Sequence, residues 1–183
     1  MRLVIDTGVF IPCGDKSEDK IKSIKLFGNL LPRIAEKTDV EILLSTEILN
    51  EYKKIRAMIR KYNCHPLPEF HSSVFRNLDR LLGLRRLRKC ISRKFGPYSF
   101  HVIESSKLEK YEVEEFVDDK EDVKFLKVAL AAASGGDVYL VSVDDESLLK
   151  LRKDEGRFNS LCSKYQEARN IQICLPNEAV AWY

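Results

Sequence analysis

Five short, largely apolar runs rich in β-branched residues recur along the chain, and they constrain its fold more than any other feature. They cover residues 3–5, 40–44, 100–103, 138–143 and 171–175. Because the runs are mostly apolar rather than strictly alternating, they are typical of strands covered on both faces. The stretches between them carry helical periodicity. The sequence therefore predicts an α/β protein, with a central parallel sheet of about five strands in a three-layer α/β/α arrangement.

The length of 183 residues fits one domain, predicted over residues 1–183, because chains divide only well beyond roughly 200 residues. With 44% hydrophobic and 32% charged residues, the composition is that of a globular chain rather than a disordered one. No apolar run approaches the roughly 18 residues of a membrane helix, and the first residues do not resemble a signal peptide. We therefore expect a cytoplasmic protein that does not bind membranes.

The cysteines are scattered and odd in number. They are Cys13, Cys64, Cys90, Cys162 and Cys174. No CxxC pair indicates a zinc site or a redox motif, so we expect reduced thiols. Metal binding by Cys64 and His65 together with His71 is an alternative that these residue types leave open. No G-x-x-x-x-G-K-[ST] loop is present, which excludes nucleotide hydrolysis of the P-loop type.

Charge is distributed unevenly along the chain, although the net charge is only +3. Residues 53–103 hold thirteen Lys and Arg against two acids, whereas residues 104–155 hold eight against fifteen. The periodicity of apolar residues over 74–91 predicts one long helix within a basic helical segment at about 53–98. Aromatic residues are interleaved with these basic residues, as in surfaces that bind phosphates and stack unpaired bases. A solvated pair of amphipathic helices is the alternative. The predicted RNA contacts are Arg56, Arg60, Arg80 and Lys89.

Acidic residues stand where two of the predicted strands end. Asp6 follows the first strand directly, and Asp144 and Asp145 follow the run at 138–143. In an open parallel sheet, ligands bind in the crevice beyond the carboxyl ends of the strands. A carboxylate placed directly after an apolar strand is partly buried and requires a partner. These positions are therefore the first candidates for a functional site.

Two further acids are expected at the same end of the sheet. Ser45 is predicted to cap a helix over residues 46–58, which places Glu51 about two turns into that helix. Asp122 stands at the start of the helix that contains Phe125. Taken singly, Asp122 could serve only as a favourable charge at a helix N-terminus, and Glu51 could be a solvated surface acid.

Four carboxylates that converge would repel one another unless a cation neutralised them. Hard oxygen ligands without nearby His or Cys favour Mg²⁺ or Mn²⁺ over zinc. The sequence therefore predicts a metal site formed by Asp6, Glu51, Asp122 and Asp144, with Asp145 as an alternative or additional ligand. Such an ion activates a water molecule and stabilises charge on the departing oxygen.

These pieces together resemble the PIN-domain family of nucleases. The matching stretches are Val4-Ile5-Asp6-Thr7-Gly8-Val9-Phe10, Ser45-Thr46-Glu47-Ile48-Leu49-Asn50-Glu51-Tyr52, Asp122-Val123-Lys124-Phe125-Leu126-Lys127-Val128-Ala129 and Tyr139-Leu140-Val141-Ser142-Val143-Asp144. The closing Pro176-Asn177-Glu178-Ala179 is similar to the tail of the subgroup that includes toxin components of toxin-antitoxin pairs.

The resemblance implies that Asp6, Glu51, Asp122 and Asp144 are catalytic residues that bind Mg²⁺ or Mn²⁺. Thr7 and Ser142 would support them. The implied reaction is endonucleolytic hydrolysis of single-stranded RNA. An antitoxin or other protein partner and a homodimer are further expectations.

An alternative hypothesis is a catalytically weak or inactive protein of the PIN fold that binds RNA or assembles a complex. Gly8 and Val143 are the residues that favour it, since the family commonly has Asn and Gly at these two positions.

Overall fold

The computed structural model describes residues 1–14, 16–61, 63–64, 66–84 and 92–181. Its strands form one sheet in the order β3-β4-β2-β1-β5-β6. They are β1 (Arg2–Ile5), β2 (Val40–Leu44), β3 (Ser92–Phe95), β4 (Tyr98–Val102), β5 (Val138–Val141) and β6 (Ile171–Cys174). Five of these strands pair in parallel, which confirms the predicted sheet, and β3 adds an antiparallel edge beside β4.

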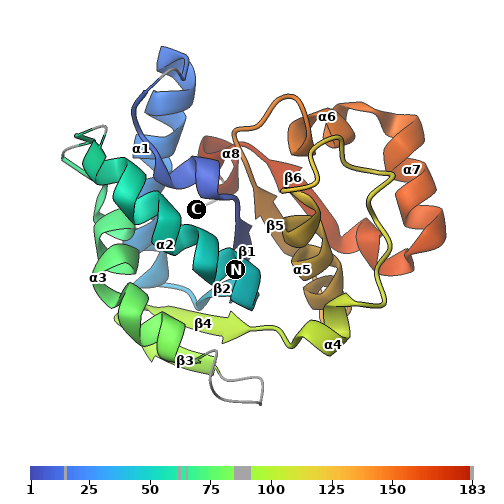
Figure 1. Ribbon diagram of the computed structural model, residues 1–183, viewed down its shortest axis with the longest axis horizontal. Helices are drawn as coiled ribbons and strands as arrows, with labels where there is room; N and C mark the ends of the chain where they lie inside the picture. The colour runs from blue at the N-terminus through green and yellow to red at the C-terminus, as the bar shows by residue number, and fades with distance from the viewer. Residues whose placement is uncertain (15, 62, 65, 85–91, 182–183) are drawn as a thin grey trace.

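Helices cover both sides of the sheet (Figure 1). On one side lie α1 (Glu18–Ala35), α2 (Thr46–Lys61) and α3 (Glu69–Leu84), and on the other lie α5 (Val123–Ala133), α6 (Leu148–Lys153) and α7 (Glu155–Lys164). The short elements are η1 (Thr7–Phe10), α4 (Ser105–Leu108), η2 (Gln166–Asn170) and α8 (Pro176–Val180). This confirms the three-layer α/β/α architecture. No helix of the described part of the chain has both the length and the apolar character to cross a membrane.

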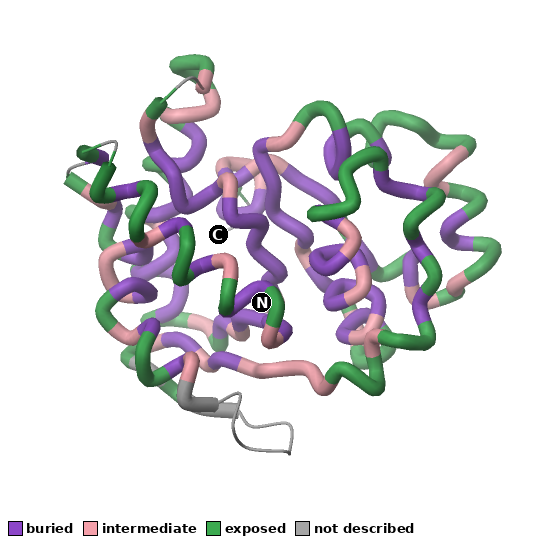
Figure 2. Tube along the Cα trace, in the orientation of Figure 1, coloured by how far each residue is buried: buried purple, intermediate pink, exposed green. Residues whose placement is uncertain are grey.

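The buried centre of the sheet determines where the site lies. Leu3, Val4 and Ile5 of β1 are completely buried, as expected for a strand covered on both faces (Figure 2). β1 pairs with β5 so that Ile5 stands opposite Val141. The next residue on each strand, Asp6 or Ser142, is therefore placed at the same carboxyl edge.

Helix α2 begins as the sequence predicts. The Oγ of Ser45 accepts a hydrogen bond from the backbone N–H of Ile48 at 3.2 Å, which satisfies one of the amides left free at a helix start. The helix continues to Lys61, three residues beyond the predicted end. Its buried residues include Tyr52, whose hydroxyl donates to the carbonyl oxygen of Ile5 at 2.7 Å and so holds α2 against the end of β1.

The prediction of one long helix over 74–91 is confirmed over residues 74–84. Helix α3 ends at Leu84, residues 85–91 lie outside the described residues, and β3 follows at Ser92. β3 and β4 form a hairpin whose turn contains Gly96 with a φ of 62°, a conformation that glycine adopts without steric cost. In its described residues, the basic segment thus contains parts of two helices and an edge strand.

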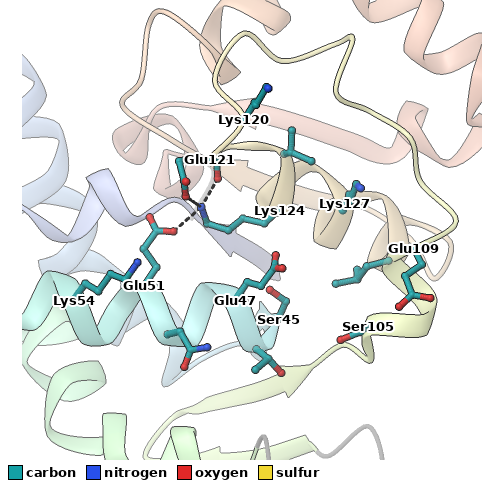
Figure 3. A pocket seen from close by; sticks show the side chains of 14 residues that line it. Ser45, Glu47, Glu51, Lys54, Ser105, Glu109, Lys120, Glu121, Lys124 and Lys127 are labelled. Atoms are coloured by element: carbon teal, nitrogen blue, oxygen red, sulfur yellow. Dashed lines mark hydrogen bonds and ion pairs between the residues drawn. The ribbon is translucent and has the colours of Figure 1, made fainter.

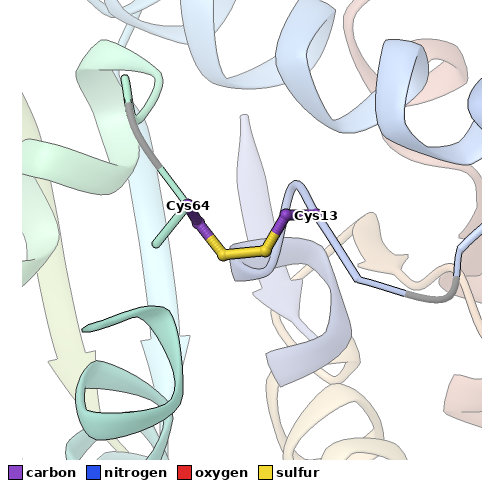
Figure 4. Close-up of a disulfide and its surroundings, with 2 residues drawn as sticks. All are labelled: Cys13 and Cys64. Carbon is purple, nitrogen blue, oxygen red and sulfur yellow. A yellow bond between two sulfur atoms is a disulfide. The ribbon is translucent and has the colours of Figure 1, made fainter. Parts of the chain in front are cut away.

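The prediction that all cysteines are reduced is wrong for two of them. Cys13, after η1, and Cys64, after α2, form a disulfide across 51 positions of sequence (Figure 4). The two thiols become neighbours only when η1 packs against α2, which the spacing of cysteines along the chain does not reveal. Cys162 and Cys174 are free, buried thiols, and Cys90 lies outside the described residues.

Candidate functional site

The Asp6 carboxylate lies at the end of β1 and is 5% exposed. Its Oδ2 accepts a hydrogen bond from Ser142 Oγ at 2.7 Å, and its Oδ1 accepts one from the backbone N–H of Gly8 at 3.1 Å. Burial raises the pKa of Asp6 above its ordinary value, although the hydrogen bonds from Ser142, Gly8 and Thr7 oppose the rise. The negative charge of Asp144 raises the pKa further. Asp6 is therefore a desolvated carboxylate in an environment that is already negative.

Asp122 is the second buried carboxylate of the site, and it is 6% exposed. It precedes α5 as the N-cap residue but makes no capping hydrogen bond, and its Oδ2 has no hydrogen-bond partner among the described residues. Burial and then the charge of Asp6 raise its pKa to about 7, with a smaller contribution from Asp144. Ser147 lowers it. The role of a simple helix charge therefore does not account for Asp122.

Asp144 is the third carboxylate of the group, and its charge raises the pKa of both Asp6 and Asp122. Its backbone N–H donates to Ser142 Oγ at 3.0 Å, and its Oδ1 accepts from the backbone N–H of Glu146 at 2.8 Å. Ser142 thus contacts both Asp6 and the turn that carries Asp144. The supporting role predicted for Ser142 stays a prediction.

Glu51 is joined to the site through Thr7 but is also paired with a lysine. Its Oε1 accepts a hydrogen bond from Thr7 Oγ1 at 2.5 Å, and the same hydroxyl lies 3.3 Å from Asp6 Oδ1. Its Oε2 lies 2.6 Å from the ammonium nitrogen of Lys124 (Figure 3). Both oxygens of Glu51 are therefore engaged by groups of the protein itself.

Two open pockets adjoin these side chains. Asp6 and Asp144 line a pocket of about 390 Å³ together with Gly8 and Val143. Glu51 and Lys124 line another of about 590 Å³, between α2 and the start of α5 (Figure 3). Asp6 and Glu51 are thus reached by solvent from different pockets, and Thr7 connects the two carboxylates.

Asp145 differs from its neighbour Asp144. It is exposed, and its carboxylate oxygens lie 2.7 Å from Lys20 Nζ and 3.6 Å from Lys153 Nζ. The hydrogen bond from Lys20 is the largest cause of the lowered pKa of Asp145. Of the two adjacent acids, Asp144 is therefore the one whose charge acts on Asp6 and Asp122.

Gly8 sits in a confined position beside Asp6. A Cβ atom at this residue would lie 3.1 Å from Cγ2 of Val143 and 3.3 Å from Oδ2 of Asp6. A larger residue at position 8 therefore requires Val143 to shift, so the two departures from the PIN pattern lie in contact with each other.

The predicted RNA contacts lie on the outer surfaces of α2 and α3. Arg60 and Arg80 are exposed, and Arg56 is partly buried and 3.5 Å from Asp79 of α3. None of these three lines the 590 Å³ pocket beside Glu51. Lys89 lies outside the described residues. These positions leave RNA binding a prediction.

The aromatic residues of this segment are placed differently from the expectation of a stacking surface. Tyr52, Phe70, Phe75 and Tyr98 belong to the buried core. Phe70, for example, has its ring centroid 5.1 Å from that of Tyr98. The apolar periodicity of the helices places these rings inward, so the exposed part of α2 and α3 is basic without them.

Within the described ranges, no group of three or more His, Cys, Asp or Glu side chains is arranged so that it could hold a metal ion. The donor chemistry of Asp6, Asp122 and Asp144 nevertheless fits a hard cation, because Asp122 Oδ2 is a buried carboxylate oxygen without a hydrogen-bond partner in this part of the chain. Glu51 does not fit in the same way, since its charge is already neutralised by the ammonium group of Lys124.

The alternative metal site at Cys64 and His71 is not supported by their contacts. Cys64 is in the disulfide, and the Nε2 of the fully buried His71 lies 2.8 Å from the carbonyl oxygen of Val9. His65 lies outside the described residues.

Sequence reasoning missed two side chains of the site, Lys124 and Ser147. Lys124 lies in the first turn of α5 and is 8% exposed, which is unusual for a lysine. Its position two residues after Asp122 could have indicated that it lies near the site. If the start of α5 places Asp122 at the carboxyl edge of the sheet, the first turn of α5, which contains Lys124, lies near that edge as well. Ser147 is 3% exposed, and its hydrogen bond to Asp122 depends on the fold of the loop after β5, which no sequence pattern indicates.

Comparison with known proteins gives no match for this chain, whether with protein-family models, curated proteins or solved structures. The likeness to PIN-domain nucleases therefore rests on its sequence stretches and on the α/β/α arrangement. Membership of that family and nuclease activity stay predictions.

Proposed function

We propose that this chain is a PIN-like, metal-dependent endoribonuclease that hydrolyses phosphodiester bonds of single-stranded RNA with Mg²⁺ or Mn²⁺. One observation carries the proposal. Asp6, Asp122 and Asp144 are far apart in sequence, yet the charge of Asp144 raises the pKa of both Asp6 and Asp122, the charge of Asp6 also raises the pKa of Asp122, and Asp122 has a buried oxygen without a hydrogen-bond partner among the described residues. Such excess negative charge is relieved by a divalent cation.

The residues of the site would have different roles in the proposed reaction. Asp6, Asp122 and Asp144 would hold the ion, which when bound supplies an activated water molecule and stabilises charge on the leaving oxygen. Ser142 and the backbone N–H of Gly8 fix the direction of the Asp6 carboxylate. Because Asp6 is almost fully buried, few water molecules would compete with its carboxylate for a bound cation.

The basic surface of α2 and α3 is the proposed contact for the RNA backbone. Arg60 and Arg80 present exposed guanidinium groups there, and Arg56 lies between the two helices. Phosphate contacts of this kind give affinity without reading base sequence. A cytoplasmic location, an antitoxin or other protein partner and a homodimer go with this proposal as predictions.

The decisive experiment measures cleavage of an unstructured RNA with Mn²⁺ or Mg²⁺. Asp6→Asn should lower the rate at least 100-fold and leave the fold intact by circular dichroism. The matched control is Asp145→Asn, which changes a neighbouring acid that is paired with Lys20 and should keep most of the activity. Equal rates for the wild-type protein and Asp6→Asn would overturn the proposal.

A second candidate is an inactive protein of the same fold that binds RNA or assembles a complex. The Glu51–Lys124 ion pair favours it, because it neutralises one of the four acids without a metal. Calorimetry with Mn²⁺ separates the candidates. Binding that is lost in Asp122→Ala supports the nuclease, whereas no binding by the wild-type protein supports the second candidate.

A further inference from the structure

The ammonium group of Lys124 is bound by two acidic residues, Glu51 and Glu121. It lies 2.6 Å from Glu51 Oε2 and 3.2 Å from Glu121 Oε2, and it also donates to the carbonyl oxygen of Glu121 (Figure 3). These contacts use the three N–H donors of the ammonium group. Lys124 is therefore a satisfied cation rather than a side chain that extends into solvent.

The charge of Lys124 is maintained despite its burial. Burial alone would lower its pKa, but the hydrogen bonds and charges of Glu51 and Glu121 outweigh that effect and raise it. The side chain is 8% exposed, and its ammonium nitrogen lies 5.0 Å from the ring centroid of Phe125. A buried charge of this kind is stable only beside its partner, so Lys124 and Glu51 form a unit that bridges α5 and α2.

Glu51 therefore differs from Asp122, because one of its oxygens is in a short ion pair with a lysine. Its Oε1 is occupied by Thr7 Oγ1 at 2.5 Å and its Oε2 by Lys124, whereas Asp122 retains an oxygen with no partner among the described residues. A metal ligand must offer a free lone pair toward the ion, and binding through Glu51 would require the separation of a short ion pair.

We propose that Lys124 takes the place of a cation at Glu51, so that the site holds one divalent ion on Asp6, Asp122 and Asp144, and Glu51 is not a ligand. The inference rests on the proposed metal binding and narrows it to a single ion. Lys124 is a positioning residue in this arrangement, because it acts through Glu51 and Thr7. Removal of the lysine should leave Glu51 free to hold a second divalent ion.

The experiment counts Mn²⁺ ions bound per chain by calorimetry and by the electron paramagnetic resonance signal of free Mn²⁺, without RNA. The wild-type protein should bind one ion and Lys124→Met two, while the double variant Lys124→Met with Glu51→Gln should return to one. The matched control is Lys127→Met, which removes a lysine one turn later in α5 that pairs with Glu114 instead, and it should bind one ion.

Two results would overturn the inference alone: two ions on the wild-type protein, or one ion on a folded Lys124→Met. If Lys124→Met does not fold, two other variants test the inference. Glu51→Gln should keep the single ion, and Asp122→Asn should lose it. Loss of the ion in Glu51→Gln would then overturn the inference. A wild-type protein that binds no Mn²⁺ would instead overturn the proposed function itself.

Discussion

At the scale of single residues, the negative charge of the buried Asp122 carboxylate is unfavourable in the metal-free protein. Asp122 is ordinarily ionised in an unfolded chain above about pH 4, but its folded pKa is raised to about 7. Because the folded state binds the proton more tightly, this group costs stability increasingly between about pH 4 and pH 7, and the full cost is present at pH 8.

Asp122→Asn should therefore stabilise the metal-free protein at pH 8 by about 1–3 kcal/mol, since the amide removes a charge that faces Asp6 and Asp144. Urea unfolding in EDTA measures this change. Asp137→Asn alters an exposed carboxylate and should change stability by less than about 0.5 kcal/mol. With saturating Mn²⁺ the wild-type protein should gain stability and Asp122→Asn should not. A variant less stable than the wild-type protein in EDTA contradicts this view of Asp122.

His71 makes the stability of the protein depend on pH in the opposite direction to Asp122. It is completely buried between aromatic rings, and burial lowers its pKa to about 4 although the carbonyl oxygen of Val9 opposes the change. The unfolded chain takes up a proton near pH 6.5 and the folded chain only near pH 4, so stability falls as the pH decreases through this window. From pH 7 to pH 5 the loss should be about 2 kcal/mol.

Urea unfolding at pH 5 and pH 7 tests this expectation with His71→Gln. The variant lacks the titrating ring, so its stability should change between these pH values by about 2 kcal/mol less than that of the wild-type protein. His101, which is partly exposed on β4, provides the matched control, and His101→Gln should keep the wild-type dependence. An unchanged pH dependence in His71→Gln would show that other groups cause it.

At the scale of elements, the packing of α1 against α3 depends on a glycine. Gly28 lies inside α1, and a Cβ atom there would stand 2.4 Å from Pro68 Cβ and 2.5 Å from His71 Nδ1. Contacts this short cannot be accepted without movement of α3. Gly28 thus allows a close approach of two helices rather than a turn of the backbone.

Gly28→Ala should destabilise the protein by about 1–3 kcal/mol, although alanine is the better helix former. Gly156→Ala is the matched change, because a Cβ atom at that exposed helical position meets only Asp154 Oδ1 at 3.5 Å. It should be neutral or stabilise by up to about 1 kcal/mol. Thermal and urea unfolding measure both variants, and equal effects of the two would contradict the close approach at Gly28.

The same scale explains which elements the sequence could predict. The five parallel strands are apolar runs buried on both faces, so they could be predicted from the sequence. β3 has the sequence Ser-Arg-Lys-Phe and lies at the edge of the sheet, where pairing on only one side requires no apolar run. The sequence does contain one indication of this hairpin, the Gly96-Pro97 pair at its turn.

The site could be predicted only in part for a related reason. Asp6, Asp122 and Asp144 follow from strand ends and a helix start, which sequence patterns locate well. The pairing of Glu51 with Lys124 depends on how closely α2 approaches α5, and no local pattern encodes that distance. The disulfide between Cys13 and Cys64 has the same origin in packing.

At the scale of the whole molecule, the charge that is separated along the sequence is also separated in space. The basic residues of α2 and α3 lie on one side of the sheet, and the acidic stretch before α5 lies on the other side with α6 and α7 (Figure 1). A polyanion would therefore approach from the side of α2 and α3. The proposed RNA contacts can be tested there without altering the proposed metal ligands.

Arg60→Gln and Arg80→Gln should each weaken binding of single-stranded RNA and lower the slope of log K against log salt concentration by about 0.7, the value for one lost phosphate contact on a single strand. Arg169→Gln removes the same charge from an exposed position on η2, across the sheet, and should leave the slope unchanged. Fluorescence anisotropy at several salt concentrations measures the slopes, with Asp6→Asn as the background so that the RNA remains intact. If all three substitutions lower the slope equally, binding follows net charge alone, and the surface of α2 and α3 is not the RNA site.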